Sequence, residues 1–482
     1  MYLGIDLGTS GIKLLVMDER QQIVATVNQP LSVERPDTGW SEQDPESWIN
    51  ATAKAFDELA ANAPQAVKDI RAIGLSGQMH GATMLDADDK PVAPCILWND
   101  TRSYKEAAKL DATEGFRSLT GNIVFPGFTA PKLVWMHNNK PDLFDRIKKV
   151  LLPKDYLRLW LTGDYVSDYS DSAGTAWLDV GSRTWSDQLL AATGLDQSHM
   201  PALAESIEST GKIRQALVER WGFSPDTIVA GGAGDNAASA LATGIVAEGD
   251  AFLSLGTSGV IYAATNSYRP LPDSAVHTFC HSTANHWCHM AVILAATDAL
   301  NWYAKLVGSD AATLTKALGN EVHAPGSTLF FPYLGGERTP HNDASIRGGF
   351  IGLAHPDDRD SLTRTVLEGI SYAFMDGIKA LEAAGTHLDR LIAVGGGSSS
   401  DYWLSLLATI LGKQIDRPAA GDFGGAFGAA RTGLVADLKC DPAEVCTMPT
   451  IDQSFHPNTD LQPAFADAYA RYAAAYPSLK DL

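Results

Sequence analysis

The chain has 482 residues, of which 45% are hydrophobic and 20% charged, and its formal net charge is −20. This length exceeds a comfortable single hydrophobic core, so we expect two domains. The excess of acidic residues argues against a nucleic-acid partner or an anionic membrane surface, and the sequence contains no apolar stretch long enough to span a bilayer.

The cysteines and the N-terminus predict a cytoplasmic protein. Five cysteines are few and odd in number, which is typical of a reducing compartment. The chain starts directly with a strand pattern that contains an acid, so we expect no signal peptide. Cys280-His281 and Cys288-His289 lack the CxxC spacing of zinc sites, and the segment favours a hairpin over a metal centre.

The first part of the chain alternates strand and helix patterns. Three short strands are predicted at 2–7, 12–17 and 22–27. A helix follows, with Asp44 as its N-cap and Pro45 at its first position. Buried-strand patterns come next at 72–76 and 95–98. This alternation predicts an α/β domain.

The second part repeats that order. A strand pair at 252–264 precedes helical stretches near 291–306 and 361–384. The apolar run 391–394 then ends in a triple glycine, and a helix is predicted from about Asp401. The stretch 465–476 predicts an Ala-rich amphipathic helix near 463–478, which can pack on either domain or on a second subunit.

One five-residue motif occurs twice, about half a chain apart. Leu7-Gly8-Thr9-Ser10-Gly11 returns as Leu255-Gly256-Thr257-Ser258-Gly259, and each copy lies between two apolar runs. This pattern is typical of a β-hairpin. Glycine lets backbone N–H groups and hydroxyls of such a turn approach phosphate oxygens. A single copy could be an ordinary hairpin turn with no ligand. Two copies in matching contexts predict a duplicated domain with phosphate bound between the halves.

A second internal similarity supports the duplication. Segment 240–246 resembles segment 429–435, and both are rich in small residues. Small residues on helices let two backbones approach closely, although both segments can also be simple buried helices. Together with the repeated motif they predict two related halves, 1–245 and 246–482.

The motifs resemble the actin-like ATPase superfamily and, within it, the carbohydrate kinases that include glycerol kinase, ribulokinase and xylulokinase. The resemblance rests on segments 4–10, 127–135, 232–236, 256–258 and 395–397. Segments 76–81, 97–100 and 152–157 are most similar to the D-xylulose kinases of this family. The resemblance implies two duplicated actin-like (ribonuclease H-like) α/β domains with an interdomain cleft that binds ATP, Mg²⁺ and a sugar.

Two aspartates are the candidate catalytic residues. Asp235 follows an apolar run and a glycine turn and begins a helix, so it is either an N-cap or a carboxylate facing a cleft. The family carries its general base at this position. Asp6 lies in an apolar strand, which is costly unless it is paired or meets a cation. The adjacent phosphate turn favours Mg²⁺, held through water, over a carboxylate satisfied by backbone N–H groups.

The glycine-rich turns are the candidate nucleotide site. The resemblance implies that both hairpin turns hold the β- and γ-phosphates, and that the glycine loop before the later helix contacts the adenosine or the α-phosphate. The residues concerned are Gly8, Thr9, Ser10, Gly11, Gly256, Thr257, Ser258, Gly396, Gly397 and Asp401. Lys13 either reaches a phosphate or is a solvated strand residue.

The sugar site is expected at a glycine-flanked turn. Met79 and His80 follow a strand, and α/β sites form at such strand ends. By the resemblance, His80 binds sugar hydroxyls and Met79 shapes the pocket wall. Asn236 binds a sugar hydroxyl or satisfies its turn, and Trp98 stacks on a sugar face or belongs to the core. The nearby Asp100 and Arg102 can simply pair with each other.

The resemblance therefore implies an ATP-dependent kinase that phosphorylates D-xylulose to D-xylulose 5-phosphate. A kinase for L-ribulose, L-fuculose, gluconate or glycerol is the near alternative, and an ATP-switched chaperone or filament subunit is the distant one. A homodimer is left open. The polar turn Glu337-Arg338-Thr339-Pro340 has no assigned role.

Overall fold

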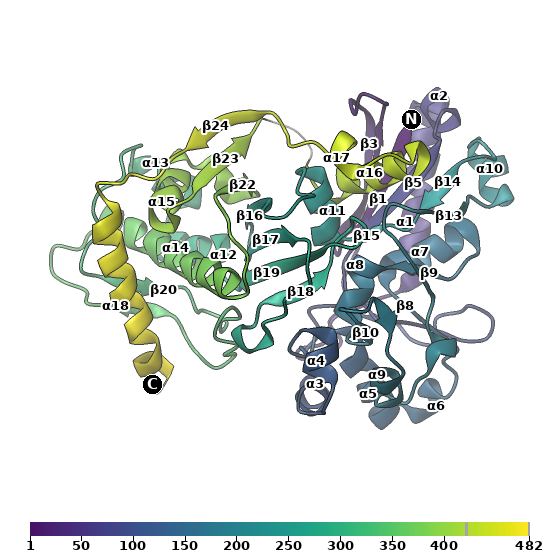
Figure 1. Ribbon diagram of the computed structural model, residues 1–482, viewed down its shortest axis with the longest axis horizontal. Helices are drawn as coiled ribbons and strands as arrows, with labels where there is room; N and C mark the ends of the chain where they lie inside the picture. The colour runs from purple at the N-terminus through teal and green to yellow at the C-terminus, as the bar shows by residue number, and fades with distance from the viewer. Residues whose placement is uncertain (420–422, 481–482) are drawn as a thin grey trace.

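The computed structural model describes residues 1–419 and 423–480. The chain forms two halves, each built around a mixed β-sheet with helices packed against it (Figure 1). In Figure 1 the N-terminal half lies to the right in purple and blue, and most of the C-terminal half lies to the left in green and yellow.

The N-terminal sheet has seven strands. In spatial order they are β13 (Ser209–Lys212), β14 (Ile228–Ala230), β5 (Ala72–Gly77), β1 (Tyr2–Leu7), β2 (Gly11–Met17) and β3 (Ile23–Pro30), with β15 (Ala233–Gly234) also pairing with β5. The pair β1–β2 is antiparallel, whereas β1 and β5 run parallel. The three strands predicted at the N-terminus are confirmed.

The C-terminal sheet also has seven strands. Their order is β18 (His277–Cys280), β19 (Trp287–Ile293), β17 (Gly259–Thr265), β16 (Ala251–Leu255), β22 (Arg390–Val394), β23 (Gln414–Pro418) and β24 (Ile451–Phe455). Again the hairpin β16–β17 is antiparallel, and β16 runs parallel to β22. Each copy of the repeated motif forms the turn of the equivalent hairpin, so the predicted duplication is confirmed.

The helices are distributed over both halves. Those of the N-terminal half are α1 (Pro45–Asn62), α2 (Pro64–Lys68), α3 (Tyr104–Asp111), α4 (Phe116–Thr120), α5 (Thr129–Asn139), α6 (Pro141–Phe144), α7 (Pro153–Thr162), α8 (Tyr169–Ser172), α9 (Asp187–Ala191), α10 (Gln215–Trp221) and α11 (Asp235–Ala242). Those that follow are α12 (Thr297–Leu306), α13 (Ala311–Ala317), α14 (Arg359–Ala383), α15 (Asp401–Leu411), α16 (Gly425–Leu438), α17 (Pro442–Val445) and α18 (Gln462–Lys480).

Short strands outside the two sheets pair locally. They are β4 (Glu42–Gln43), β6 (Thr83–Leu85), β7 (Cys95–Ile96), β8 (Lys149–Leu151), β9 (Val166–Asp168), β10 (Leu178–Asp179), β11 (Thr184–Trp185), β12 (Ala202–Ala204), β20 (Leu329–Phe331) and β21 (Gly349–Ile351). The loop between β20 and β21 contains the unassigned turn 337–340.

Local sequence signals explain several helix boundaries. Asp44 caps α1 by accepting a hydrogen bond from the N–H of Glu46 at 3.0 Å, and Pro45 occupies the first helical position, as predicted. The expected helix near 291–306 is partly wrong. Residues up to Ile293 belong to β19, and α12 begins only at Thr297. An apolar run cannot by itself distinguish a buried strand from a buried helix.

The helices α11 and α16 join the two halves. A Cβ atom on Gly428 of α16 would lie only 1.8 Å from the carbonyl oxygen of Ala238 on α11, so the two backbones are in direct contact. Figure 1 shows α16, in yellow-green, beside β1 and β5 of the N-terminal half. The close approach predicted for 240–246 and 429–435 is thus found just before each segment, and within the segments Arg431 donates to the carbonyl of Leu241 at 2.6 Å.

The C-terminal helix α18 packs on the C-terminal half. The hydroxyl of Tyr469 donates to Asp376 of α14 at 2.5 Å, and the hydroxyl of Tyr472 donates to that of Tyr333 at 2.8 Å. Of the two open alternatives for this helix, packing within the chain is observed.

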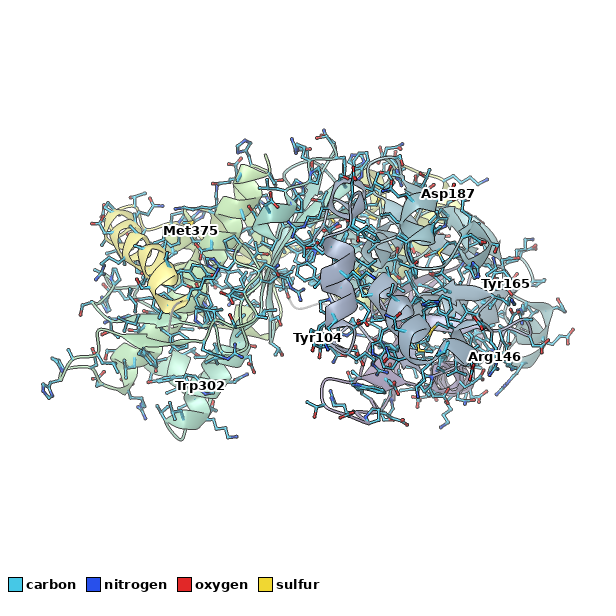
Figure 2. All side chains as sticks on the ribbon, turned by 90° about the horizontal axis from the view of Figure 1, so that it is seen from below. Tyr104, Arg146, Tyr165, Asp187, Trp302 and Met375 are labelled. Atoms are coloured by element: carbon cyan, nitrogen blue, oxygen red, sulfur yellow. The ribbon has the colours of Figure 1, made fainter. Side chains whose placement is uncertain are left out.

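The surface carries scattered exposed aromatic residues. Tyr104 on α3 and Trp302 on α12 are 58% and 39% exposed, and Figure 2 labels them on different halves of the molecule. Single exposed aromatic residues are normal for folded proteins. In the part of the chain that the structure describes, no helix has the length and apolar character needed to cross a membrane.

Candidate active site

The candidate residues gather where parallel strands end. The carboxyl ends of β1 and β5 carry the first hairpin turn and the Met79–His80 turn, and those of β16 and β22 carry the second hairpin turn and the glycine loop. Ligands of α/β proteins bind at such ends because the loops there are exposed and their backbone groups are unpaired.

Asp235 is the first residue of α11, and Gly234 is its N-cap. The N-cap alternative for Asp235 is therefore wrong. Its Oδ1 atom accepts hydrogen bonds from the N–H and the side-chain amide of Asn236, at 2.7 and 2.9 Å. Burial, together with the negative charge of Asp6, raises the pKa of Asp235 to about 6. The carboxylate is thus held in one orientation, with a pKa close to the working range of a general base.

Asp6 lies on β1, between Lys13 of β2 and Ser76 of β5 in the sheet register. The start of α16 covers it, since a Cβ atom on Gly425 would lie 2.7 Å from Oδ1 of Asp6. In the sheet register Asp6 of β1 and Ala233 of β15 lie on either side of Ser76 of β5, and Asp235 follows two residues after Ala233, so the two carboxylates are carried by the same edge of the sheet. Two adjacent carboxylates at a phosphate turn are a donor set that Mg²⁺ accepts when waters and phosphates complete its shell.

The Met79–His80 turn lies directly beside Asp235. A Cβ atom on Gly234 would meet the side chain of Met79 at 3.0 Å, and one on Gly174 would meet the ring of His80 at 2.5 Å. Both glycines therefore make room for the predicted sugar residues. The structure brings Met79, His80 and Asp235 together, although they are far apart in the sequence.

The backbone of His80 has a φ angle of +68°, which non-glycine residues rarely adopt. The ammonium of Lys132 holds this turn by donating to the carbonyls of His80 and Gly127, each at 2.7 Å. Lys132 is fully buried, and burial lowers its pKa to about 7. Sequence analysis gave Lys132 no role, although it lies in one of the family-like segments.

The imidazole of His80 is neutral. Burial lowers its pKa to about 3, and its Nδ1–H donates to the carbonyl of Gly174 at 2.7 Å. The other nitrogen, Nε2, is consequently an acceptor. The ring stacks on Phe128 with a centroid distance of 4.7 Å, and Phe279 of the C-terminal half lies 6.2 Å away. An apolar wall with one acceptor is a typical sugar-binding surface.

The first hairpin turn is linked to this pocket by hydrogen bonds. The hydroxyl of Thr9 donates to Oε1 of Gln78 at 2.9 Å and accepts from the indole N–H of Trp98 at 3.0 Å. Gln43 donates to the Thr9 carbonyl at 2.8 Å and accepts from Gln78. Trp98 is 48% exposed, so it is not a core residue. Sequence analysis missed Gln43 and Gln78.

The predicted pairing of Asp100 with Arg102 is present. The Arg102 guanidinium donates to both carboxylate oxygens of Asp100, and it also pairs with Glu42 at 2.6 Å. The same guanidinium lies 3.6 Å from the ring centroid of Trp40. These groups satisfy one another, which makes this cluster structural.

The second hairpin turn contacts the glycine loop. A Cβ atom on Gly395 would lie 2.9 Å from the carbonyl of Leu255, while Thr257 and Ser258 remain exposed. The Gly256 carbonyl accepts from Thr297 at the start of α12. Among the described residues, neither Thr9 nor Ser10 forms a hydrogen bond with the second turn.

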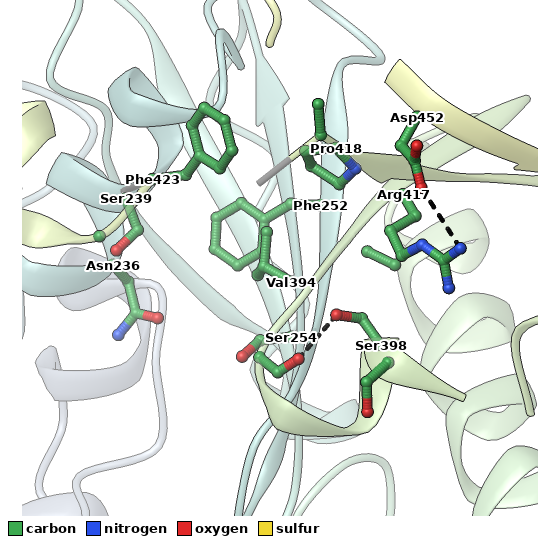
Figure 3. A pocket seen from close by; sticks show the side chains of 15 residues that line it. Asn236, Ser239, Phe252, Ser254, Val394, Ser398, Arg417, Pro418, Phe423 and Asp452 are labelled. Atoms are coloured by element: carbon green, nitrogen blue, oxygen red, sulfur yellow. Dashed lines mark hydrogen bonds and ion pairs between the residues drawn. The ribbon is translucent and has the colours of Figure 1, made fainter. Parts of the chain in front are cut away.

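A cavity of about 680 Å³ lies between α11, the glycine loop and the start of α16. Figure 3 shows Asn236 and Ser239 on one side of it and Arg417 on the other. Asp401 orients Arg417 by an ion pair of 2.5 Å. A second cavity, of about 260 Å³, borders Gly396 and Gly397. The glycine loop thus has room for a ligand beside it.

Two family descriptions match the sequence. The N-terminal domain of the FGGY family of carbohydrate kinases matches residues 1–242, and the C-terminal domain of the same family matches residues 251–436. The chain belongs to the FGGY family of carbohydrate kinases. The resemblance drawn from the motifs is confirmed, and the chaperone and filament alternatives are wrong.

Relatives and solved structures agree with this family. The chain is 44% identical to the xylulose kinase of Escherichia coli (strain K12), over the full length of both proteins. A crystal structure of a "xyloylose kinase" from Brucella ovis is 57% identical, with a TM-score of 0.98 over 99% of both chains. The xylulose kinase structure from Rhodospirillum rubrum is 26% identical, with a TM-score of 0.92 over 99% of both chains. The predicted two-domain α/β fold of the family is confirmed.

Proposed function

We propose that this FGGY kinase transfers the γ-phosphoryl group of ATP to a primary hydroxyl of D-xylulose, giving D-xylulose 5-phosphate. The proposal rests on the contact between the Met79–His80 turn and the start of α11, where Met79 packs on Gly234, the residue before Asp235. A base and a sugar-binding surface are thus adjacent. The names of the relatives support xylulose as the sugar.

The sugar lies against Met79 and His80 in this proposal. The Nε2 atom of His80 accepts a hydrogen bond from a sugar hydroxyl, because its Nδ1–H is already used by Gly174. Asn236 holds Asp235 through its side-chain amide and makes a further contact with the sugar in this proposal. Lys132 acts through the turn that it fixes.

Asp235 acts as the general base. Its carboxylate accepts the proton of the attacking hydroxyl as the new oxygen–phosphorus bond forms and the bond from the γ-phosphorus to the bridging oxygen breaks. One oxygen, Oδ1, is engaged by Asn236, which leaves Oδ2 to take the proton. At pH 7 the group is mostly ionised, since its pKa is about 6.

The nucleotide lies at the glycine-rich turns. Gly8 to Gly11 and Gly256 to Ser258 contact the β- and γ-phosphates, and Gly396, Gly397 and Asp401 lie towards the nucleoside. Asp6 would hold Mg²⁺, through water, and a bound ion would supply neutralisation of the phosphate charge. Lys13 faces Asp6 across the hairpin and extends this cluster of charges towards the phosphates.

A substrate panel tests the proposal. ADP release from MgATP is measured with D-xylulose, D-ribulose, L-ribulose, L-fuculose, gluconate and glycerol. The expected result is the highest kcat/KM with D-xylulose. A preference for another compound refutes D-xylulose as the substrate, and turnover with none of them refutes the proposal as a whole. The cytoplasmic location and a homodimer stay predictions.

A further inference from the structure

The loop between β20 and β21 carries an arginine whose backbone is tightly fixed. On one side of Arg338, the buried carboxylate of Glu337 accepts hydrogen bonds from the N–H groups of Leu294 (2.9 Å) and Arg338 (2.7 Å). On the other side, the buried hydroxyl of Thr339 accepts from the N–H of Val292 at 3.0 Å. Both neighbours are anchored at the end of β19, so the loop presents Arg338 from a rigid base.

The Arg338 side chain reaches the wall of the sugar pocket. Its guanidinium carbon lies 4.6 Å from the ring centroid of Phe125, a residue of the N-terminal half. Phe125 packs edge-on against Phe128, and Phe128 stacks on His80. After burial and the charge of Lys132, the charge of Arg338 also lowers the pKa of His80. A cation of the C-terminal half therefore lies close to the sugar turn of the other half.

The guanidinium retains unused donors. Arg338 is half-buried, and within residues 1–419 and 423–480 neither a carboxylate nor a hydrogen-bond acceptor contacts its side chain. By contrast, Arg102 and Arg431, which are also shielded from solvent, are hydrogen-bonded. A guanidinium has five N–H donors, and no nitrogen of Arg338 is among the buried side-chain atoms without a hydrogen-bond partner, so these donors are open to solvent and to a bound ligand. This arrangement suits a ligand rich in oxygen acceptors.

We infer that Arg338 is a sugar-binding residue that the C-terminal half contributes to the pocket, donating hydrogen bonds to oxygen atoms of the ketose opposite His80. The inference rests on the proposed function. Donors from Arg338 and an acceptor from His80 then hold the sugar from the two halves.

The test replaces the guanidinium by an apolar side chain of similar length. Arg338→Met is expected to raise the KM for D-xylulose and the sugar Kd measured without ATP by about tenfold or more, because hydrogen bonds to a charged donor are lost. The KM for ATP stays within about twofold of the wild-type value. Arg338→Lys, which keeps the charge but not the planar fork, gives an intermediate KM.

Arg359→Met is the matched control. Arg359 is an exposed arginine at the start of α14, and among the residues that the structure describes its guanidinium pairs with the neighbouring Asp360 alone. This variant is expected to leave both KM values unchanged. Thermal unfolding of each variant checks that the fold is kept. If Arg338→Met does not fold, Phe125→Leu removes the ring under the guanidinium and is expected to raise the sugar KM about threefold.

The outcomes separate this inference from the proposed function. An unchanged sugar KM in folded Arg338→Met, or in Phe125→Leu if that variant has to be used, overturns the inference while wild-type turnover of D-xylulose stands. A lower kcat with unchanged sugar KM also overturns it, because the arginine would then act on the phosphoryl group. If the wild type prefers another compound of the panel, the same measurements are made with that compound. If no compound is turned over, both fail.

Discussion

The hydroxyl of Thr9 donates a hydrogen bond of 2.9 Å to the side-chain carbonyl of Gln78. Thr9 lies in the turn proposed to hold phosphate, and Gln78 immediately precedes Met79 of the sugar turn. The two proposed substrate sites therefore share a hydrogen-bonded wall. The indole N–H of Trp98 completes it by donating to the same hydroxyl at 3.0 Å.

Replacing Trp98 tests this wall. Trp98→Phe keeps a ring but removes the donor that orients Thr9, so we expect the KM for ATP to rise about fivefold, the equivalent of one neutral hydrogen bond of about 1 kcal/mol. The KM for the sugar should not change. Trp98→Ala is the comparison, because it also removes the ring predicted to stack on the sugar. An unchanged KM for ATP in Trp98→Phe contradicts the role of the indole N–H in orienting Thr9. A sugar KM that rises only in Trp98→Ala supports stacking of the ring on the sugar.

The pH dependence of catalysis tests Asp235. Its pKa is raised to about 6, so the carboxyl is protonated below this pH and cannot accept a proton. We expect kcat/KM for the sugar to fall about tenfold per pH unit below pH 6 and to be level above it. Initial rates from pH 4.5 to 8.5, with preincubation controls for denaturation, give the profile.

Two variants test whether the fall in kcat/KM below pH 6, the acid limb of the profile, is due to Asp235. Asp235→Asn should abolish turnover and leave the sugar Kd within about threefold of wild type, since the amide keeps the shape but not the basicity. In Asp6→Asn the loss of a neighbouring negative charge should move the limb to lower pH, whatever the residual rate. Appreciable turnover by Asp235→Asn would remove it from the role of base.

Lys132 is expected to support the sugar site without touching the sugar. Lys132→Met removes both hydrogen bonds that hold the turn with φ +68° at His80, and we expect the sugar KM to rise about tenfold. Lys149→Met is the control, because Lys149 also donates to two carbonyls but lies away from the pocket. Equal effects of the two variants on the sugar KM would refute the positioning role.

The contact between α11 and α16 predicts a glycine that cannot be replaced. A methyl group at Gly428 would lie 1.8 Å from the Ala238 carbonyl, so Gly428→Ala has to separate the helices. We expect a loss of about 1–3 kcal/mol in the free energy of unfolding. Gly349→Ala, at a position with no atom within 4 Å of the new Cβ, should have little effect. Denaturant unfolding compares them, and equal stabilities would contradict the close contact.

Much of the fold could be predicted because its signals are local. Alternating apolar residues indicated β1 and β2, the capping pair Asp44 and Pro45 indicated the start of α1, and the repeated motif indicated both hairpins. The start of α12 could not be predicted, because the run before it is equally compatible with the strand β19.

The candidate site could be predicted only in part, because many of its contacts join residues that are far apart in the sequence. Asp235 and His80 were expected from strand ends and from the family resemblance. Gln43, Lys132 and Arg338 were not given roles, because each acts through a contact with a residue far away in the sequence. Spacing along the chain carries no signal for such contacts.

The position of α16 has a consequence for biosynthesis. A Cβ atom on Gly4 of β1 would lie 1.8 Å from the Ala426 carbonyl, and one on Gly74 of β5 would lie 1.7 Å from that of Ala429, so α16 covers the face of both strands. During translation, this face stays bare until nearly the whole polypeptide has left the ribosome. The N-terminal half of this kinase is synthesised first, yet one apolar face of its sheet stays exposed until α16 has been made. Burial of that face therefore depends on completion of the chain.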